Sequence, residues 1–415
     1  MKPYHVLLFI TAVMAILGTL YLVFPEDEQV VEAVELVEAV EPDSIESPDS
    51  MVIDTVVPEA PKPKMVVPQV AVDSTTDSRL FLRTFYASLS ETGERVVRVL
   101  HYGDSQIEED RMTQQIREAL QKRYGGSGVG LMPLAQTIPS RTVKQQFWMN
   151  GRQTQPQGIK RYMVYAPKRD QRADGLYGVM GQVAMMNDSL VSGSEEVMAV
   201  CTPQDGRNRY TRWQVFADSS ITYSFAGDTA WLRGRGQVYG LSQESDTGVI
   251  VDNIPMRGCL GLVFTKMDSA QLATFYQSQH VRLIILQFGG NAIPSNRNPG
   301  TIQGIVKGLR QQVRHLRTLA PEASFLFIGP SDMLTQEDGE WITYPMVPYM
   351  DRLLRKMALE ENIAYFSLYR WMGGAGSMAH WQETGLAGSD GVHFTRAGAR
   401  KAGNAVAEWI LSGTY

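Results

Sequence analysis

The spacing of apolar residues predicts two kinds of structure after residue 78. Four short apolar runs, rich in branched residues, predict buried strands at 96–102, 281–288, 323–328 and 363–366. Five segments with apolar residues every three or four positions predict helices at 79–92, 109–124, 301–319, 348–361 and 395–411. Strands that alternate with helices indicate an α/β domain with a parallel sheet covered on both faces.

The stretch from 136 to 250 has a different pattern, without helical periodicity. Short apolar runs alternate there with Gly, Asp, Asn and Ser, and they predict strands at 161–166, 176–186, 195–201, 212–217, 220–225, 229–233 and 237–241. Such regular short strands are typical of a β-sandwich. We therefore expect a β-rich module at 136–250, inserted into one α/β domain formed by 79–135 and 251–415.

The N-terminal segment is apolar enough to enter a membrane. Val6 to Phe24 is a run of 19 residues without a charge, with Lys2 before it and Glu26, Asp27 and Glu28 after it. A helix of this length nearly spans a hydrocarbon layer of about 30 Å. The charge order predicts a single-pass signal-anchor at 1–24, with the N-terminus in the cytoplasm and the rest on the periplasmic or extracytoplasmic side. A cleaved signal peptide is the alternative, and it exports the chain equally.

Charge is distributed unevenly along the chain, although the net value is only -5. Residues 25–78 contain 14 acidic residues, 2 lysines and several prolines, which predicts a disordered, extended linker. Residues 79–415 carry a net charge of +6, too weak a basic balance to suggest nucleic-acid binding. The 2 cysteines, Cys201 and Cys259, exclude a disulfide scaffold and leave open whether they pair.

Three polar segments follow predicted strands or precede the last helix. Ser105 comes directly after the first strand, Asn291 follows a Gly-Gly turn after the second, and Asp390 and His393 lie before the final helix. Open parallel sheets present such segments at one edge. There, His393 can act as the base for the Ser105 hydroxyl, Asp390 can orient the imidazole, and Asn291 can donate to an oxyanion.

In this order, the three segments resemble the motifs of the SGNH (GDSL-type) hydrolases. Gly103-Asp104-Ser105 matches the first block of that family, Gly289-x-Asn291 the third and Asp390-x-x-His393 the last. The resemblance implies a flavodoxin-like three-layer α/β/α fold and a Ser-His-Asp mechanism on acyl esters, without a cofactor or a metal. It assigns Ser105 as nucleophile, His393 as base and Asp390 as its partner. It also implies an oxyanion hole formed by Asn291, the Ser105 N–H and a second-block glycine, for which Gly258 is the match.

The layout is similar, more narrowly, to exported peptidoglycan O-acetylesterases, which carry a carbohydrate-binding-like β-module between the first two blocks. Those enzymes often have His directly after the serine, where this chain has Gln106. The resemblance implies a membrane-bound serine esterase acting on an O-acetylated carbohydrate polymer, with peptidoglycan as the best single substrate. Two alternatives stay open at this point, an O-acetyltransferase that uses the same acyl-enzyme and a non-catalytic wall-binding protein. The ligand of the β-rich stretch is not assigned.

Overall fold

The computed structural model describes residues 76–149, 151–155, 159–186, 196–204 and 209–414, which all belong to one compact unit. The anchor predicted at 1–24 lies outside these residues, as does nearly all of the linker predicted at 25–78. Ser78 already begins a short 3-10 helix capped by Asp77, so regular structure starts before the predicted end of the linker. In the described part of the chain, no helix combines the length and apolar character needed to cross a membrane.

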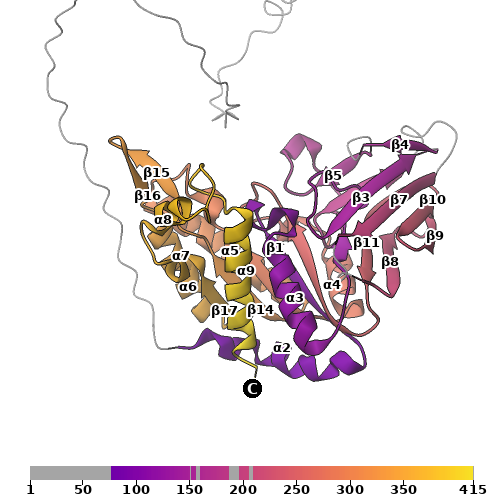
Figure 1. Cartoon of the computed structure of the whole chain (residues 1–415), viewed down its shortest axis with the longest axis horizontal. Coiled ribbons are helices and arrows are strands. Elements are labelled where there is room, and N and C mark those ends of the chain that lie inside the picture. The colour runs from indigo at the N-terminus through magenta and orange to yellow at the C-terminus, as the bar shows by residue number, and fades with distance from the viewer. Residues whose placement is uncertain (1–75, 150, 156–158, 187–195, 205–208, 415) are drawn as a thin grey trace, which may run out of the picture. The chain divides into compact units, whose positions relative to one another are not determined.

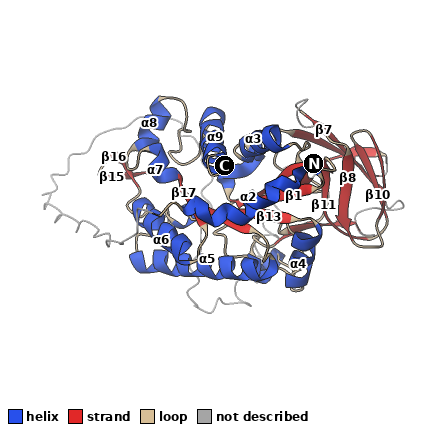
Figure 2. Ribbon diagram, turned by 90° about the horizontal axis from the view of Figure 1, so that it is seen from below, coloured by secondary structure: helices blue, strands red, loops and turns tan. Residues whose placement is uncertain are grey.

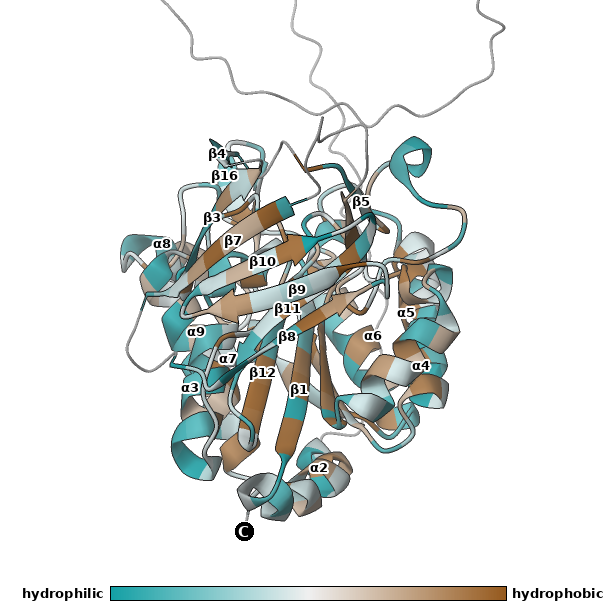
Figure 3. Ribbon diagram, turned by 90° about the vertical axis from the view of Figure 1, so that its right-hand side faces the viewer, coloured by the Kyte–Doolittle hydropathy of each residue, from teal (hydrophilic) through white to brown (hydrophobic). Residues whose placement is uncertain are grey.

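Five parallel strands form the central sheet, in the order β12-β1-β13-β14-β17. Figure 1 labels three of them, β1, β14 and β17. They are β1 (Val96–Gly103), β12 (Gly248–Pro255), β13 (Val281–Gln287), β14 (Ser324–Gly329) and β17 (Ala364–Ser367). Most of their residues are buried, and Figure 3 shows β1 and β12 as largely hydrophobic. The strand β12 was not predicted, because Asp252 and Asn253 interrupt its apolar run.

Helices cover both faces of this sheet. One face carries η1 (Ser78–Leu82), α2 (Arg83–Ser88), η2 (Leu89–Gly93), α3 (Thr113–Tyr124), α7 (Leu368–Met372), α8 (Ser377–Glu383) and α9 (Arg396–Leu411). The other carries α4 (Ser269–Ser278), α5 (Pro299–Leu319) and α6 (Val347–Glu360). Figure 2 shows α3 and α9 on one side of the strands and α4, α5 and α6 on the other. The predicted α/β/α layering is therefore present.

Two predicted helices differ from the observed elements. The segment predicted as one helix at 79–92 is a short α-helix between two 3-10 turns. The helix predicted from 109 begins at Thr113, because Glu109 and Asp110 both adopt left-handed backbone angles, with φ of 59° and 64°. These two residues end the 3-10 segment η3 (Ser105–Asp110) instead of starting α3.

Two antiparallel sheets, each containing five strands, occupy the β-rich stretch. The first contains β3 (Val143–Met149), β4 (Arg152–Thr154), β7 (Glu196–Pro203), β9 (Thr222–Ala226) and β10 (Thr229–Arg233). The second contains β2 (Gly130–Met132), β5 (Arg161–Met163), β6 (Gln182–Met186), β8 (Arg212–Ala217) and β11 (Gly236–Glu244). Each of the seven predicted runs overlaps one of these strands.

The two antiparallel sheets share a hydrophobic core that includes Phe147 and Leu232 from the first and Met186 and Leu241 from the second. Elements at its borders cross the predicted module limits. The strand β2 precedes residue 136 and pairs with β11, whereas β12 spans residue 250 and pairs with β1 of the parallel sheet. The limits at 135 and 250 stay predictions. A further hairpin, β15 (Leu334–Glu337) and β16 (Glu340–Thr343), lies between β14 and α6.

A fully buried ion group joins the parallel sheet to the neighbouring β-strands. Arg98 on β1 donates to Asp252 on β12, with Nη1 3.0 Å from Oδ2, and it also donates to Glu244 at the end of β11. Asp252 accepts in addition the backbone N–H of Leu131 on β2, at 2.7 Å. Burial acts to raise the pKa of Glu244, but Arg98 and the hydrogen bonds that Glu244 accepts hold it at about 2. Glu244 is therefore ionised, and it also pairs with Arg212 at 2.7 Å, whereas burial raises the pKa of Asp252 against the opposing effect of Arg98.

We predict that Arg98→Met destabilises the protein strongly. The substitution keeps the volume similar but leaves Asp252 buried without its cation and Glu244 with Arg212 alone, and breaking such a buried group costs about 3 to 5 kcal/mol in comparable cases. Denaturant unfolding of the variant measures this loss. The matched control is Arg95→Met, since Arg95 is exposed and forms only a long ion pair with Glu91. A change below about 1 kcal/mol for Arg98→Met would contradict this role.

Candidate active site

The carboxyl ends of β1 and β13 bring two of the predicted segments together. Gly103 at the end of β1 pairs with Gln287 at the end of β13, and the Asp104 N–H continues this contact to the Gln287 carbonyl at 3.3 Å. Ser105 then opens η3, while a turn through Gly289, with φ of 117°, leads into η8 (Gly290–Ala292). Parallel pairing in this register places the Ser105 and Asn291 loops at one edge of the sheet.

Ser105, His393 and Asp390 form a continuous chain of hydrogen bonds, as predicted from their order in the sequence. Ser105 Oγ lies 2.8 Å from His393 Nε2, and His393 Nδ1 lies 2.7 Å from Asp390 Oδ2. A carboxylate can only accept, so Nδ1 carries the proton and Nε2 is left to accept the serine hydroxyl. The loop that carries His393 precedes α9, whose first turn is capped by Thr395 as expected.

Asp390 is held by its own loop. Its Oδ1 accepts the backbone N–H groups of Val392 and His393, both at 2.9 Å. Burial acts to raise the pKa of Asp390, but the hydrogen bonds from His393 and Val392 outweigh it and keep the pKa below its ordinary value. Asp390 therefore stays ionised and fixes the orientation of the imidazole.

Asn291 reaches the same edge, where it contacts Asp104. Its Nδ2 donates to Asp104 Oδ2 at 3.1 Å and to the Cys259 carbonyl at 3.3 Å. Both amide hydrogens are thus engaged, and the longer bond, to Cys259, is the one more easily released toward a ligand. This amide orientation is favoured because the opposite one would face the amide oxygen toward two acceptors.

Asp104 is a site residue whose role could not be predicted from the sequence beyond its place in the motif. Its carboxyl group is buried, and it accepts the Gln106 N–H at 3.0 Å as well as the Asn291 amide. Burial raises its pKa to about 6, although the Gln106 N–H and the nearby His393 act in the opposite direction. The sequence signal for Asp104 was its place in the Gly-Asp-Ser motif, but burial of its carboxyl depends on the fold.

Gln106 joins the two loops that carry the serine and the histidine. Its side-chain amide donates to the Val392 carbonyl at 2.7 Å and lies 3.5 Å from Ser331 Oγ. The residue is buried, and its Oε1 has no hydrogen-bond partner among the described residues. Gln106, the residue directly after the serine of the Gly-Asp-Ser motif, therefore links the Ser105 loop to the His393 loop.

Gly258 lies beside the site in a turn with φ of 70°, a backbone region that favours glycine. It precedes Cys259, whose carbonyl contacts Asn291, but Gly258 itself does not line the cavity at Ser105. Its neighbour Arg257 forms two hydrogen bonds of 2.6 Å with the buried carboxylate of Glu108. Its predicted role as an oxyanion donor stays a prediction.

A small cavity of about 60 Å³ opens next to Ser105. Its apolar wall consists of Phe288, Pro294, Pro330 and Met333, and its polar wall includes Asn291, Ser331 and His393. Drug-sized ligands occupy cavities of about 300 to 1,000 Å³, so this one accepts only a small group.

The two cysteines do not form a disulfide with each other. Cys201 and Cys259 are both free and buried, in different hydrophobic cores. Within the described residues, no cluster of three or more His, Cys, Asp or Glu has the arrangement of a metal site.

We predict that Asp104→Asn changes the pH dependence of stability. The pKa of Asp104 is about 6 in the folded state and about 3.9 in the unfolded state. Ionisation of Asp104 therefore lowers the stability of the wild type progressively from about pH 4 to about pH 6, and the whole effect is present above about pH 6. The variant lacks this effect. The difference in unfolding free energy, variant minus wild type, should therefore increase by about 2 to 3 kcal/mol from pH 4 to pH 8.

Denaturant unfolding at both pH values measures this difference, and comparing the two removes the pH-independent effect of the lost hydrogen bonds. A parallel pH dependence of the two proteins would show that Asp104 is not buried as a carboxylate. Asp170→Asn is a suitable control, since Asp170 is exposed.

Comparison with known proteins supports the family and the fold. The family model of the GDSL-like lipases/acylhydrolases matches residues 188–401, which include Asn291, Asp390 and His393 and begin after Ser105. A solved peptidoglycan O-acetylesterase structure is similar with a TM-score of 0.63 and 20% identity, over 82% of this chain and 96% of that one. Comparison with curated proteins gives no match.

Two further solved structures match a smaller part of the chain. An acetyl xylan esterase matches with a TM-score of 0.28 and 14% identity, over 40% of this chain and 82% of its own. The periplasmic domain of a lipopolysaccharide acetyltransferase from Salmonella ser. Paratyphi A matches with a TM-score of 0.28 and 12% identity, over 40% and 72%.

Proposed function

Because the chain belongs to the GDSL-like lipase/acylhydrolase family, it is an ester hydrolase, and we propose that it is a serine esterase that removes O-acetyl groups from a cell-envelope carbohydrate, with peptidoglycan as the substrate. The observation that carries the proposal is the hydrogen-bonded chain from Ser105 through His393 to Asp390, beside a cavity of about 60 Å³. The size of that cavity suits an acetyl group. Similarity to the fold of a peptidoglycan O-acetylesterase supports the choice of polymer, and the apolar run at 6–24 supports an envelope location.

In the proposed acylation step, Ser105 Oγ attacks the carbonyl carbon of the acetyl ester while its proton passes to His393 Nε2. The distance of 2.8 Å between these atoms allows this transfer without rearrangement. The tetrahedral intermediate collapses when the bond to the sugar oxygen breaks, and that oxygen takes the proton from His393. The deacetylated sugar leaves, and the acetyl group stays on Ser105.

Deacylation repeats the same chemistry with water. A water molecule gives a proton to His393 Nε2 as its oxygen attacks the acetyl carbonyl carbon, and the Ser105 ester bond then breaks. The proton returns to Ser105 Oγ, and acetate is released. Asp390 stays ionised throughout and stabilises the imidazolium that forms in both steps.

The developing oxyanion needs hydrogen-bond donors, and we assign this role to Asn291 and the Ser105 N–H. Asn291 lines the cavity, and its bond of 3.3 Å to the Cys259 carbonyl can be exchanged for one to the oxyanion. Its second hydrogen remains on Asp104 and holds the amide in place. Gly258 does not line this cavity, so its N–H would need to move to take part.

We predict that Ser105→Ala abolishes acetate release from purified O-acetylated peptidoglycan, with a loss of at least about 10³-fold, because no other hydroxyl among the described residues is hydrogen-bonded to His393. Enzymatic acetate assay of wild type and variant measures this. Ser90→Ala, at an exposed serine, is the matched control. Turnover retained by Ser105→Ala rejects the nucleophile. Faster release from acetylated xylan than from peptidoglycan by the wild type rejects the polymer.

We also predict that the enzyme prefers acetyl to longer acyl esters, and that Met333→Ala weakens this preference. Met333 is buried and forms part of the apolar wall, so its truncation makes space for additional methylene groups. The ratio of kcat/KM for p-nitrophenyl butyrate to that for the acetate should rise about tenfold or more. Met346→Ala, a buried methionine outside this cavity, controls for loss of stability. Equal wild-type rates on the two esters would contradict the assignment of the cavity to the acyl group.

A further inference from the structure

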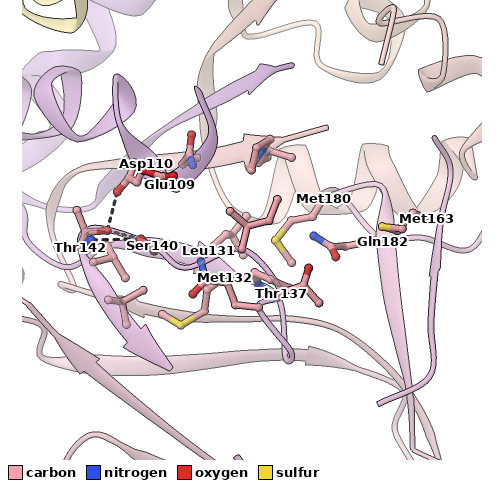
Figure 4. A pocket seen from close by; sticks show the side chains of 18 of the residues that line it. Glu109, Asp110, Leu131, Met132, Thr137, Ser140, Thr142, Met163, Met180 and Gln182 are labelled. Carbon is pink, nitrogen blue, oxygen red and sulfur yellow. Dashed lines mark hydrogen bonds between the residues drawn. The ribbon is translucent and has the colours of Figure 1, made fainter. Parts of the chain in front are cut away.

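A second cavity lies at the same edge of the parallel sheet, next to the strand β12. It is lined by Asn253 to Pro255 at the carboxyl end of β12, by Glu109 and Asp110 of η3, and by residues of β2 and β6 (Figure 4). Pro255 is paired with Gly103, two residues before Ser105. Glu109 follows Ser105 by four residues, so their Cα atoms are at most about 14 Å apart. The cavity is therefore a neighbour of the site described above.

Tyr165 connects the surroundings of the two cavities. It lines the second cavity, and the charges of Cys259 and Glu108 both act to raise the pKa of its hydroxyl. Cys259 contacts Asn291, and Glu108 belongs to the segment that begins with Ser105. The second cavity is therefore near residues that hold the catalytic segment.

The wall of the second cavity combines methionine side chains with hydrogen-bonding groups. Met132, Met163 and Met180 form much of its apolar surface. Figure 4 shows Gln182 between Met180 and Met163, and among the described residues its side-chain amide has no hydrogen-bond partner. Arg161 is fixed by Nη1 contacts to the Ala135 carbonyl at 3.2 Å and Thr137 Oγ1 at 3.3 Å, which leaves its other nitrogen atoms available.

The hydroxyl of Tyr165 and the volume of the cavity restrict the class of ligand that the cavity can bind. Burial raises the pKa of Tyr165 to about 12, so its hydroxyl remains a donor at all physiological pH values. The cavity volume of about 90 Å³ is too small for a whole sugar ring but suits one short arm with an apolar end. An acetamido group has this character, since it carries a methyl group beside an amide N–H and C=O.

The turn that forms one wall is strained and firmly held. Glu109 and Asp110 adopt positive φ angles, which costs free energy for residues other than glycine. Arg117 donates to Asp110 at 2.5 Å, Thr142 donates to it at 2.6 Å, and Arg141 donates to Glu109 at 2.7 Å. The wall therefore keeps its shape without a ligand, as a preformed binding cavity requires.

We propose that this cavity binds the N-acetyl arm of a sugar unit in the same polymer whose O-acetyl group is removed at Ser105. The methyl group packs against Met180, and the amide exchanges hydrogen bonds with Gln182 and Arg161. The proposal rests on the proposed function for the location of the polymer, and it adds a specificity for N-acetylated over plain glycans. It also explains why the cavity and Ser105 are close enough for a short oligosaccharide to reach both.

Isothermal titration of the full-length chain with tri-N-acetylchitotriose and with cellotriose tests this proposal. These sugars carry no O-acetyl group, so binding is measured without turnover. Tri-N-acetylchitotriose should bind and cellotriose should bind at least about tenfold more weakly. Gln182→Leu should weaken binding of the acetylated sugar about tenfold, because it removes the amide that the structure leaves unpaired. Equal affinity for the two sugars overturns the proposal.

Matched variants separate binding from folding. Gln153→Leu makes the same substitution at an exposed position of β4, and it should leave the affinity unchanged. If Gln182→Leu lowers the thermal unfolding temperature, Tyr165→Phe serves as a second variant that removes only a hydroxyl. Wild-type affinity in both Gln182→Leu and Tyr165→Phe overturns the proposal.

Failure of the proposed N-acetyl site can be distinguished from failure of the proposed esterase function. Hydrolysis of p-nitrophenyl acetate by the wild type depends on Ser105 and requires no second sugar. Absence of that activity with intact, Gln182-dependent sugar binding rejects the esterase but supports the cavity. Hydrolysis with no preference for N-acetylated sugars supports the esterase and rejects the cavity.

Discussion

The pairing of β1 with two parallel neighbours is the constraint on which the site depends. Gly103 at the end of β1 is opposite Gln287 of β13 on one side and Pro255 of β12 on the other. Parallel strands end at the same edge, so three segments far apart in sequence leave the sheet together. A shift of one residue would move Ser105 relative to Asn291, and because the strand residues point alternately to two helical layers, it would also expose their apolar side chains.

Ion pairs at both ends of β1 connect the parallel sheet to the antiparallel ones. Arg98 links β1 to β12 and to the end of β11, and the run Glu108, Glu109 and Asp110 after the serine pairs with a different arginine at each position. A buried charge without a partner destabilises a fold strongly, so these pairs favour one arrangement of the sheets over others. They also hold the segment that contains the nucleophile.

Sequence reasoning predicted the features that depend on local pattern. The apolar runs at 96–102 and 281–288 correspond to β1 and β13, and the order of Ser105, Asn291, Asp390 and His393 predicted the residues that meet at the edge. The strand β12 was missed because Asp252 belongs to an ion group whose partners are far away in sequence. The late start of α3 was missed for a similar reason, since Arg117 and Thr142 stabilise a turn at Asp110 that its own sequence disfavours.

The two carboxylates next to His393 illustrate what only the fold determines. Asp390 contacts the imidazole directly and is partly exposed, so its charge is stabilised by water and by hydrogen bonds. Asp104 is buried, and its charge destabilises the free protein, but it lies close enough to His393 for attraction between them. In the proposed mechanism, His393 becomes positive only while the ester is attacked. The attraction to Asp104 is therefore strongest in that step, and the unfavourable burial of this carboxylate is offset when the imidazolium exists.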